Sequence, residues 1–202
     1  MASHEGLSQP AAGRLYDRIT WLYARLSDVG GQTKTQALTW RAVRPGERVL
    51  EVGCGAGHDL RRWAAAVGPR GLAVGVDLAY ALLRLARQRA AASLVQAKAT
   101  RLPWPAEVFD AVYGAYVLDL LPREALVPAL REWRRVVRPA GRAVMVTMTW
   151  GTESFSRVVM GLWSAVYRLS PPAICAGCRP LSVAPAAREA GWHIRQRKVL
   201  IE

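Results

Sequence analysis

The sequence predicts an α/β fold with a mostly parallel, twisted sheet that is flanked by helices. Three observations predict it: short apolar runs alternate with helical segments from Arg48 onward, a glycine-rich turn follows the first run, and the chain has 202 residues. Its composition, 51% hydrophobic and 21% charged, is typical of a folded globular protein. A chain of this length suits one substantial domain, so we expect a single domain over residues 1–202.

Hydrophobic spacing places the individual elements along the chain. The strands are expected at 49–52, 72–76, 93–97, 111–113 and 142–147, with one last strand at 193–201. The helices are expected at 11–29, 59–66, 80–92, 123–138, 155–169 and 183–190. We interpret residues 1–43 as an N-terminal helical lid, 44–148 as the ligand-binding core, and 149–202 as a second lid helix with the last strand.

A glycine-rich loop, Glu51-Val-Gly-Cys-Gly-Ala-Gly57, lies between the first expected strand and the first helix of the core. Glycines there let the backbone come within contact distance of a ligand at the helix N-terminus, which indicates a nucleotide-like cofactor. The nicotinamide fingerprint requires a glycine where His58 stands. Asp77 ends the second strand, where a carboxylate can accept bonds from both ribose hydroxyls. Glu51 suits a cofactor with a positively charged end.

With these motifs, residues 44–147 resemble the class I S-adenosylmethionine-dependent methyltransferases, especially the quinone and phospholipid methyltransferase branch. Val49 to Gly57 resembles the first motif of the family, and Gly75-Val-Asp77 resembles its ribose-binding motif. The further matching segments, in the family's order, are Leu102-Pro103-Trp104, Phe109 to Tyr113, Leu118 to Pro122 and Val136 to Arg142. The resemblance implies a Rossmann-like fold and S-adenosylmethionine as the cofactor. Relatives often end in two antiparallel strands, so a single last strand implies a shortened C-terminal sheet edge.

The resemblance also assigns roles to residues of the core. The glycine loop would surround the methionine part of the cofactor, Asp77 would hold the ribose, Leu78 would flank the adenine, and Tyr116 would lie at the mouth of the site. Lys98 departs from the pattern, because many relatives have an Asp there that accepts the adenine amino group, whereas a lysine only donates. The cofactor-binding residues implied in this way are Glu51, Gly53, Cys54, Gly55, Gly57, Asp77, Leu78, Lys98, Ala99, Thr100 and Tyr116.

No single catalytic base stands out in the sequence. Methyl transfer from a sulfonium is an in-line displacement in which the protein supplies alignment, so a dedicated base is optional. The candidates for removing a proton from an amine or hydroxyl acceptor are His58, Tyr16, Tyr23, Tyr113 and Asp119. His58, at a helix start, is also explained by a role in the cofactor loop, and Tyr16 and Tyr23 by packing in a core.

The chain is strongly basic, with 28 Lys plus Arg against 15 Asp plus Glu and a formal net charge of +13. Nearly all of this charge is arginine, which pairs bidentately with phosphate and carboxylate groups. A general bias towards arginine codons explains the charge equally well. The basic amphipathic helix at 11–29 and the apolar segment after the fifth strand favour an amphiphilic acceptor, such as a phospholipid headgroup or an isoprenoid quinol, with peripheral contact to an anionic membrane.

Three alternatives for the function remain open at this stage: a soluble metabolite as acceptor, a methyltransferase directed to nucleic acid, and a methyltransferase-like scaffold without catalysis. The three cysteines, Cys54, Cys175 and Cys178, form no disulfide framework, which favours a reducing cytoplasm, and no export signal is visible. Cys175 and Cys178 lack the further ligands of a zinc site, so no metal is expected. An arsenite methyltransferase would use several cysteines and stays a minor alternative.

Overall fold

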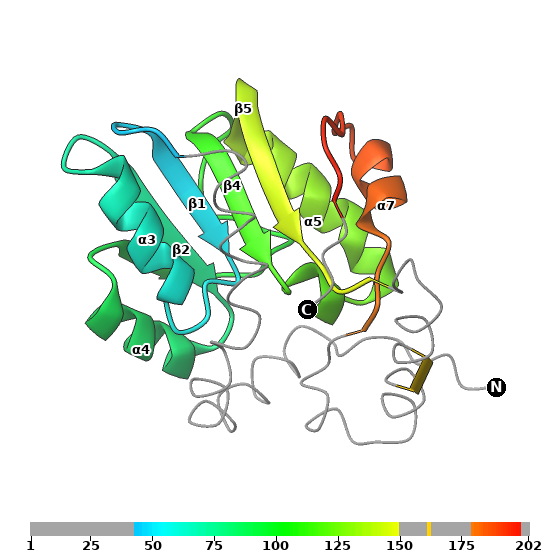
Figure 1. Cartoon of the computed structure of the whole chain (residues 1–202), viewed down its shortest axis with the longest axis horizontal. Helices are drawn as coiled ribbons and strands as arrows, with labels where there is room; N and C mark the ends of the chain where they lie inside the picture. Colours follow the sequence, from blue (N-terminus) through cyan, green and yellow to red (C-terminus); the bar gives the residue numbers. More distant parts are fainter. Residues whose placement is uncertain (1–42, 150–160, 163–178, 199–202) are drawn as a thin grey trace.

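The computed structural model describes residues 43–149, 161–162 and 179–198. They form a five-stranded sheet in the order β3-β2-β1-β4-β5, and every neighbouring pair of strands is parallel (Figure 1). The strands are β1 (Arg48–Val52), β2 (Leu72–Asp77), β3 (Ser93–Gln96), β4 (Phe109–Ala115) and β5 (Val137–Val146). The helices are α3 (His58–Val67), α4 (Tyr80–Arg89), the 3-10 turn η1 (Leu118–Leu120), α5 (Arg123–Val136) and α7 (Val183–Glu189). This confirms the expected parallel α/β fold.

The two faces of the sheet are covered by different helices. The chain moves from β1 to β2 to β3 through α3 and α4, and from β4 to β5, in the opposite direction across the sheet, through α5. Because such crossovers are right-handed, α3 and α4 lie on one face and α5 on the other, where it packs against α7 (Figure 1). The strands β1 and β4, at which the direction reverses, are neighbours in the middle of the sheet.

Burial on both faces explains why the strands are apolar runs and not alternating ones. In β1, Val49 belongs to the core on the α3 side, whereas Leu50 and Val52 belong to the core on the α5 side. Among the described residues, Trp133 of α5 is the largest fully buried side chain, and it belongs to the core on the α5 side together with Phe109 at the start of β4. The sheet is therefore a rigid platform between two apolar layers.

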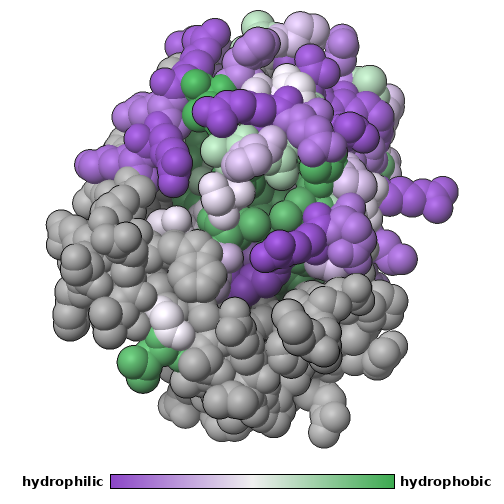
Figure 2. Space-filling model, turned by 90° about the vertical axis from the view of Figure 1, so that its right-hand side faces the viewer, coloured by the Kyte–Doolittle hydropathy of each residue, from purple (hydrophilic) through white to green (hydrophobic). Residues whose placement is uncertain are grey.

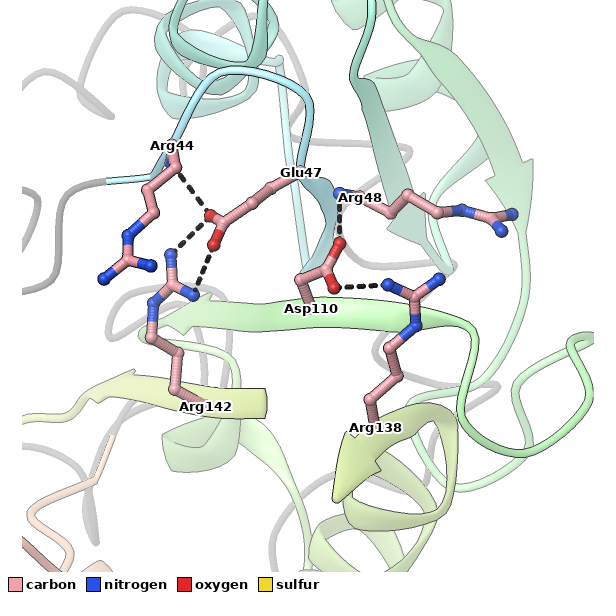
Figure 3. A network of polar contacts seen from close by, with 6 residues as sticks. All are labelled: Arg44, Glu47, Arg48, Asp110, Arg138 and Arg142. Atoms are coloured by element: carbon pink, nitrogen blue, oxygen red, sulfur yellow. Dashed lines mark hydrogen bonds and ion pairs between the residues drawn. The ribbon is translucent and has the colours of Figure 1, made fainter. Parts of the chain in front are cut away.

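Two ion pairs join strand ends at the amino edge of the sheet (Figure 3). Glu47, just before β1, accepts hydrogen bonds from the guanidinium of Arg142 at 2.6 and 2.9 Å. Asp110 of β4 accepts one from the backbone N–H of Arg48 at 2.8 Å and one from the Arg138 side chain at 2.6 Å. These contacts connect β1, β4 and β5 at the edge opposite the glycine loop.

Several element boundaries differ from the sequence expectation: β4 extends beyond the expected 111–113, α4 ends at Arg89 and not at residue 92, and the largest difference lies between α5 and β5. The helix expected at 123–138 ends at Val136, and β5 begins at Val137 and not at residue 142. Phe109 pairs with Val137 and Ala111 with Arg142, so the residues around Pro139 form an irregularity inside one strand. That early pairing extends β4 and β5 towards the amino edge.

The expected last strand at 193–201 is wrong for its described part, residues 193–198, which lie outside the sheet. All six of these residues are exposed, and Ile194 is their only apolar member, so the segment has no apolar face to bury. The helix expected at 11–29 lies outside the described residues, as does the one at 155–169 apart from Gly161 and Leu162. From the side of α5 and α7, the described surface is mostly hydrophilic around a smaller apolar area (Figure 2).

Candidate cofactor-binding site

The glycine loop folds tightly between the carboxyl end of β1 and the start of α3. The N–H groups of Gly53 and Cys54 both donate to the carbonyl oxygen of Val76 in β2, at 2.8 and 3.0 Å. Gly57 has φ of 82°, a left-handed conformation that suits glycine, and a Cβ at this position would lie 2.9 Å from the Ala86 backbone in α4. Any larger residue at Gly57 would push α4 away from the loop.

Asp77, at the end of β2, holds the loop from the neighbouring strand. Its Oδ2 accepts the Gly55 N–H at 2.8 Å, and its Oδ1 accepts the Ala79 N–H at 2.9 Å. Each carboxylate oxygen has a second lone pair, so Asp77 can accept further bonds from a diol. The side-chain amide of Gln96 donates to the Leu78 carbonyl at 2.9 Å and fixes the segment that follows. Asp77 therefore both shapes the loop and presents an acceptor beside it.

Glu51 lies in β1, is only 3% exposed, and contributes the second acid at this edge. Between the two acids lies Cys54, whose pKa is raised well above its usual value, first by burial and then by the negative charges of Asp77 and Glu51. The thiol stays protonated and donates to the Gly55 carbonyl, so Cys54 is no nucleophile. Two carboxylates around a glycine loop suit a ligand with a diol and a cationic end.

Tyr113, in the middle of β4, is buried against α3 and is unsuited to act as a base. Its hydroxyl donates to Oδ2 of Asp59 at 3.3 Å, and its ring lies edge-on to Trp63 with the centroids 4.9 Å apart. Burial, followed by the charge of Asp59, raises the pKa of Tyr113 far above its usual range. The buried Asp59 was missed by sequence reasoning, although its place two residues after Gly57 at a helix N-terminus was a signal.

Asp119, in η1, lies fully buried at the carboxyl end of β4. Its Oδ2 accepts the Met148 N–H at 2.9 Å, and Arg179 lies close enough for its charge to favour the carboxylate. Burial outweighs both effects and raises the pKa of Asp119 to about 7. Arg179 itself donates to the Leu121 carbonyl at 2.7 Å, and Leu181 N–H donates to Met148 O at 2.8 Å. Asp119 therefore ties together three segments that are distant in sequence.

His58 and Tyr116 lie closer to the loop surface. His58 is the first residue of α3, is half-buried, and has its Nε2 3.2 Å from Nη1 of Arg89. Tyr116 follows β4 directly and has φ of 55°, which is uncommon for a residue with a side chain. Its N–H donates to Val146 O at 2.8 Å. Both residues are at the carboxyl edge, whereas Tyr16 and Tyr23 lie outside the described residues.

The segment after β3 runs beside Asp77, since Ala97 N–H donates to the Asp77 carbonyl at 3.2 Å. Lys98 is exposed and forms an isolated antiparallel bridge with Arg101. Ala99 and Thr100 are half-buried between them. The turn thus presents backbone groups near the site while the Lys98 side chain lies at the surface.

The glycine loop and Asp77 lie at the carboxyl ends of β1 and β2, beside the point between β1 and β4 where the strand order reverses, which is where ligands bind in open α/β sheets. The fold and the residues of the site suit a nucleoside with a cationic end. The donors and acceptors fit S-adenosylmethionine, because Asp77 keeps acceptor capacity for a ribose diol and Glu51 is a buried acid beside the loop. Among the described residues, no group of three His, Cys, Asp or Glu side chains could hold a metal ion.

Comparison with known proteins identifies the family. Residues 49–141 match a family model described as a methyltransferase domain. The chain is 35% identical over 154 residues to a 2-phytyl-1,4-naphtoquinone methyltransferase of Synechococcus elongatus, covering 70% of this chain and 65% of that protein. It is 31% identical over 158 residues to a demethylmenaquinone methyltransferase of Symbiobacterium thermophilum, covering 72% and 61%. Residues 49–141 are therefore a methyltransferase domain, which confirms the predicted resemblance to the class I S-adenosylmethionine-dependent methyltransferases.

The structural comparison agrees with this family. A crystal structure of a SAM-dependent methyltransferase from Thermotoga maritima has a TM-score of 0.68 at 20% identity, covering 90% of this chain and 81% of that one. At this identity, the likeness concerns the fold. The chain spans slightly less than two thirds of the length of the two curated relatives above. No helix within the described part of the chain is long and apolar enough to cross a membrane.

Proposed function

We propose that the protein transfers the methyl group of S-adenosylmethionine to the ring of a quinol that carries an apolar chain. The observation that carries the proposal is the convergence of Glu51, the glycine loop and Asp77 at the carboxyl edge of β1 and β2. The likeness to a phytyl-naphtoquinone and a demethylmenaquinone methyltransferase supports the choice of acceptor over a phospholipid headgroup, a soluble metabolite or nucleic acid.

In this proposal each part of the site binds one part of the cofactor. Asp77 accepts hydrogen bonds from the ribose hydroxyls while it keeps its two backbone donors. Glu51 attracts the ammonium and sulfonium end, and the loop from Gly53 to Gly57 allows close approach of the backbone. Leu78 and the turn at Ala99 and Thr100 would hold the adenine, and Tyr116 would border the mouth of the site. The cofactor, when bound, supplies the methyl group.

The residues of this chain contribute positioning more than proton transfer. Tyr113 keeps its proton at neutral pH, since its pKa is raised far above the usual range. Asp119 is enclosed by η1 and the residues around Met148 and Arg179. His58 is then the described side chain best placed to take a proton from the acceptor. Because a quinol ring carbon can be methylated by alignment with the sulfonium, His58 contributes modestly.

The test is a transfer assay with methyl-labelled S-adenosylmethionine and a demethylated naphthoquinol in detergent, followed by extraction into organic solvent. We expect label in the quinol, a strong loss with Asp77→Asn, and no change with Asp110→Asn, whose carboxylate lies at the opposite edge of the sheet. Offering phospholipid and RNA in parallel separates the acceptors. Label in either of these, and none in the quinol, would refute the choice of acceptor.

A scaffold that kept the fold and lost the cofactor is the remaining alternative. It is distinguished by calorimetric titration of the full chain with S-adenosylmethionine and with S-adenosylhomocysteine, which lacks the sulfonium charge. The proposal predicts saturable binding of both at one site. A flat titration with both ligands would favour the scaffold.

A further inference from the structure

The half of the molecule that carries β2, β3, α3 and α4 has an unusual distribution of charge. Residues 52–106 contain eight basic residues and two acids. The two acids are withdrawn from the surface, because Asp59 is buried and Asp77 is half-buried in the cofactor site. The eight basic side chains are all exposed: Arg61, Arg62, Arg70, Arg84, Arg87, Arg89, Lys98 and Arg101. Every exposed formal charge of this segment is therefore positive.

The arginines of α3 and α4 share one face of the molecule. The two helices pack against each other on the same side of the sheet. On α4, Tyr80, Arg84 and Arg87 recur at a spacing of four and three residues, which places them on one side of the helix. Tyr80 is 60% exposed. The opposite side of α4 is buried through Leu82, Leu83 and Ala86.

On the α5 side of the sheet, exposed basic side chains also outnumber exposed acids, but acids lie among them. On α5, Arg135 pairs with Glu132 at 2.7 Å, and Arg131 lies 3.8 Å from Glu189 of α7. Acidic side chains are therefore interspersed among the basic ones on that side. The side of α3 and α4 differs in that none of its exposed charges is negative.

We infer that the α3/α4 face, defined by Arg61, Arg62, Tyr80, Arg84 and Arg87, docks on an anionic phospholipid surface. Guanidinium groups bind phosphate bidentately, and an exposed tyrosine beside them suits the region of the headgroups. Single-stranded nucleic acid is held by several stacking aromatics, of which this face offers one, Tyr80.

The inference rests on the proposed function, because an acceptor with a long apolar chain lies in a bilayer. α3 begins directly after the glycine loop, so the α3/α4 face borders the cofactor site. Docking through this face would hold that edge of the sheet next to the membrane.

The experiment is co-sedimentation of the full chain with vesicles of phosphatidylglycerol and phosphatidylcholine, against vesicles of phosphatidylcholine alone. Each basic residue near an anionic surface contributes about 1 kcal/mol, so reversing two of them in Arg84→Glu/Arg87→Glu should weaken partitioning by at least about 30-fold. The matched control is Arg131→Glu/Arg134→Glu, with the same charge change and spacing on the exposed side of α5. We expect the control to bind nearly as the wild type does, and all binding to weaken at about 0.5 M salt.

Three outcomes would overturn the inference: equal binding to neutral and anionic vesicles, an equal loss in the two double variants, or binding of an RNA oligonucleotide that depends on Arg84 and Arg87 while vesicle binding does not. Calorimetry with S-adenosylmethionine on the same samples separates this test from the proposed function. A protein that binds vesicles through α4 and shows no cofactor binding would refute the function and keep the docking surface.

Discussion

The two halves of the sheet share one architecture but are held together differently. In the half with β1, β2 and β3, backbone N–H groups of the loops converge on Val76 and Asp77, and the surface carries only positive charge. In the half with β4 and β5, side chains of opposite charge form ion pairs, as in Asp110 with Arg138 and Glu132 with Arg135. The first half carries the proposed cofactor site, and the second carries ion pairs between segments of the chain.

The largest expected effect is a loss of stability in the half with β4 and β5 when Trp133 is replaced. Trp133→Ala removes the largest fully buried side chain and should lower the free energy of unfolding by about 4 kcal/mol, as measured by denaturant titration. Trp133→Phe is the control, because it keeps most of the volume and removes an indole N–H that has no hydrogen-bond partner in the described structure. Equal losses in the two variants would contradict this account of the core.

Asp77→Asn should weaken cofactor binding in the half with β1, β2 and β3 and leave the packing of the half with β4 and β5 unchanged. The amide of Asn keeps one acceptor oxygen but loses the negative charge. That charge strengthens the hydrogen bonds from the Gly55 and Ala79 N–H groups and would strengthen those from a ribose diol. The dissociation constant for S-adenosylmethionine should therefore rise about 100-fold. Calorimetry measures this change, and Asp110→Asn is the control. If the two variants bound the cofactor equally well, the assignment of Asp77 would be wrong.

The raised pKa of Asp119 makes the stability of the half with β4 and β5 depend on pH. The folded pKa of about 7 lies above the ordinary value of 3.8, so the folded state holds a proton that the unfolded state releases between these values. The contribution of Asp119 to stability is therefore full below pH 4 and declines as the pH rises towards 7, by at most about 4 kcal/mol. Asp119→Asn should remove this decline in urea titrations at several pH values. A parallel decline in the variant would assign it to another group.

The smallest effect is expected from Lys98, at the adenine end. Lys98→Asp places an acceptor where many members of the family have an Asp. One modest hydrogen bond to the adenine should tighten S-adenosylmethionine binding by about 5-fold. Lys98→Ala separates the gain of an acceptor from the loss of a positive charge. Unchanged affinity in the Asp variant would mean that this turn does not contact the adenine.

Much of the first half could be predicted from sequence, because its signals are local. Residue type and spacing indicate a strand end both at the loop from Glu51 to Gly57 and at Asp77. In the structure the two are in contact, because the Gly55 N–H donates to Asp77. The contacts of the second half join residues that are distant in sequence, such as Asp119 with Met148 and Arg179, and no local pattern indicates them. The early start of β5 was also missed. It depends on the pairing of Phe109 with Val137, which are distant in sequence, and Pro139 in between is untypical of a strand interior.

The central claim, that the carboxyl edge of β1 and β2 holds S-adenosylmethionine, is tested most directly by amide hydrogen exchange with and without the cofactor. We predict that the cofactor slows exchange in residues 51–58 and 77–80, including the Gly55 and Ala79 amides that donate to Asp77, and leaves the Arg48 amide at the amino edge unchanged. Cofactor binding with no added protection in those two segments would contradict the claim.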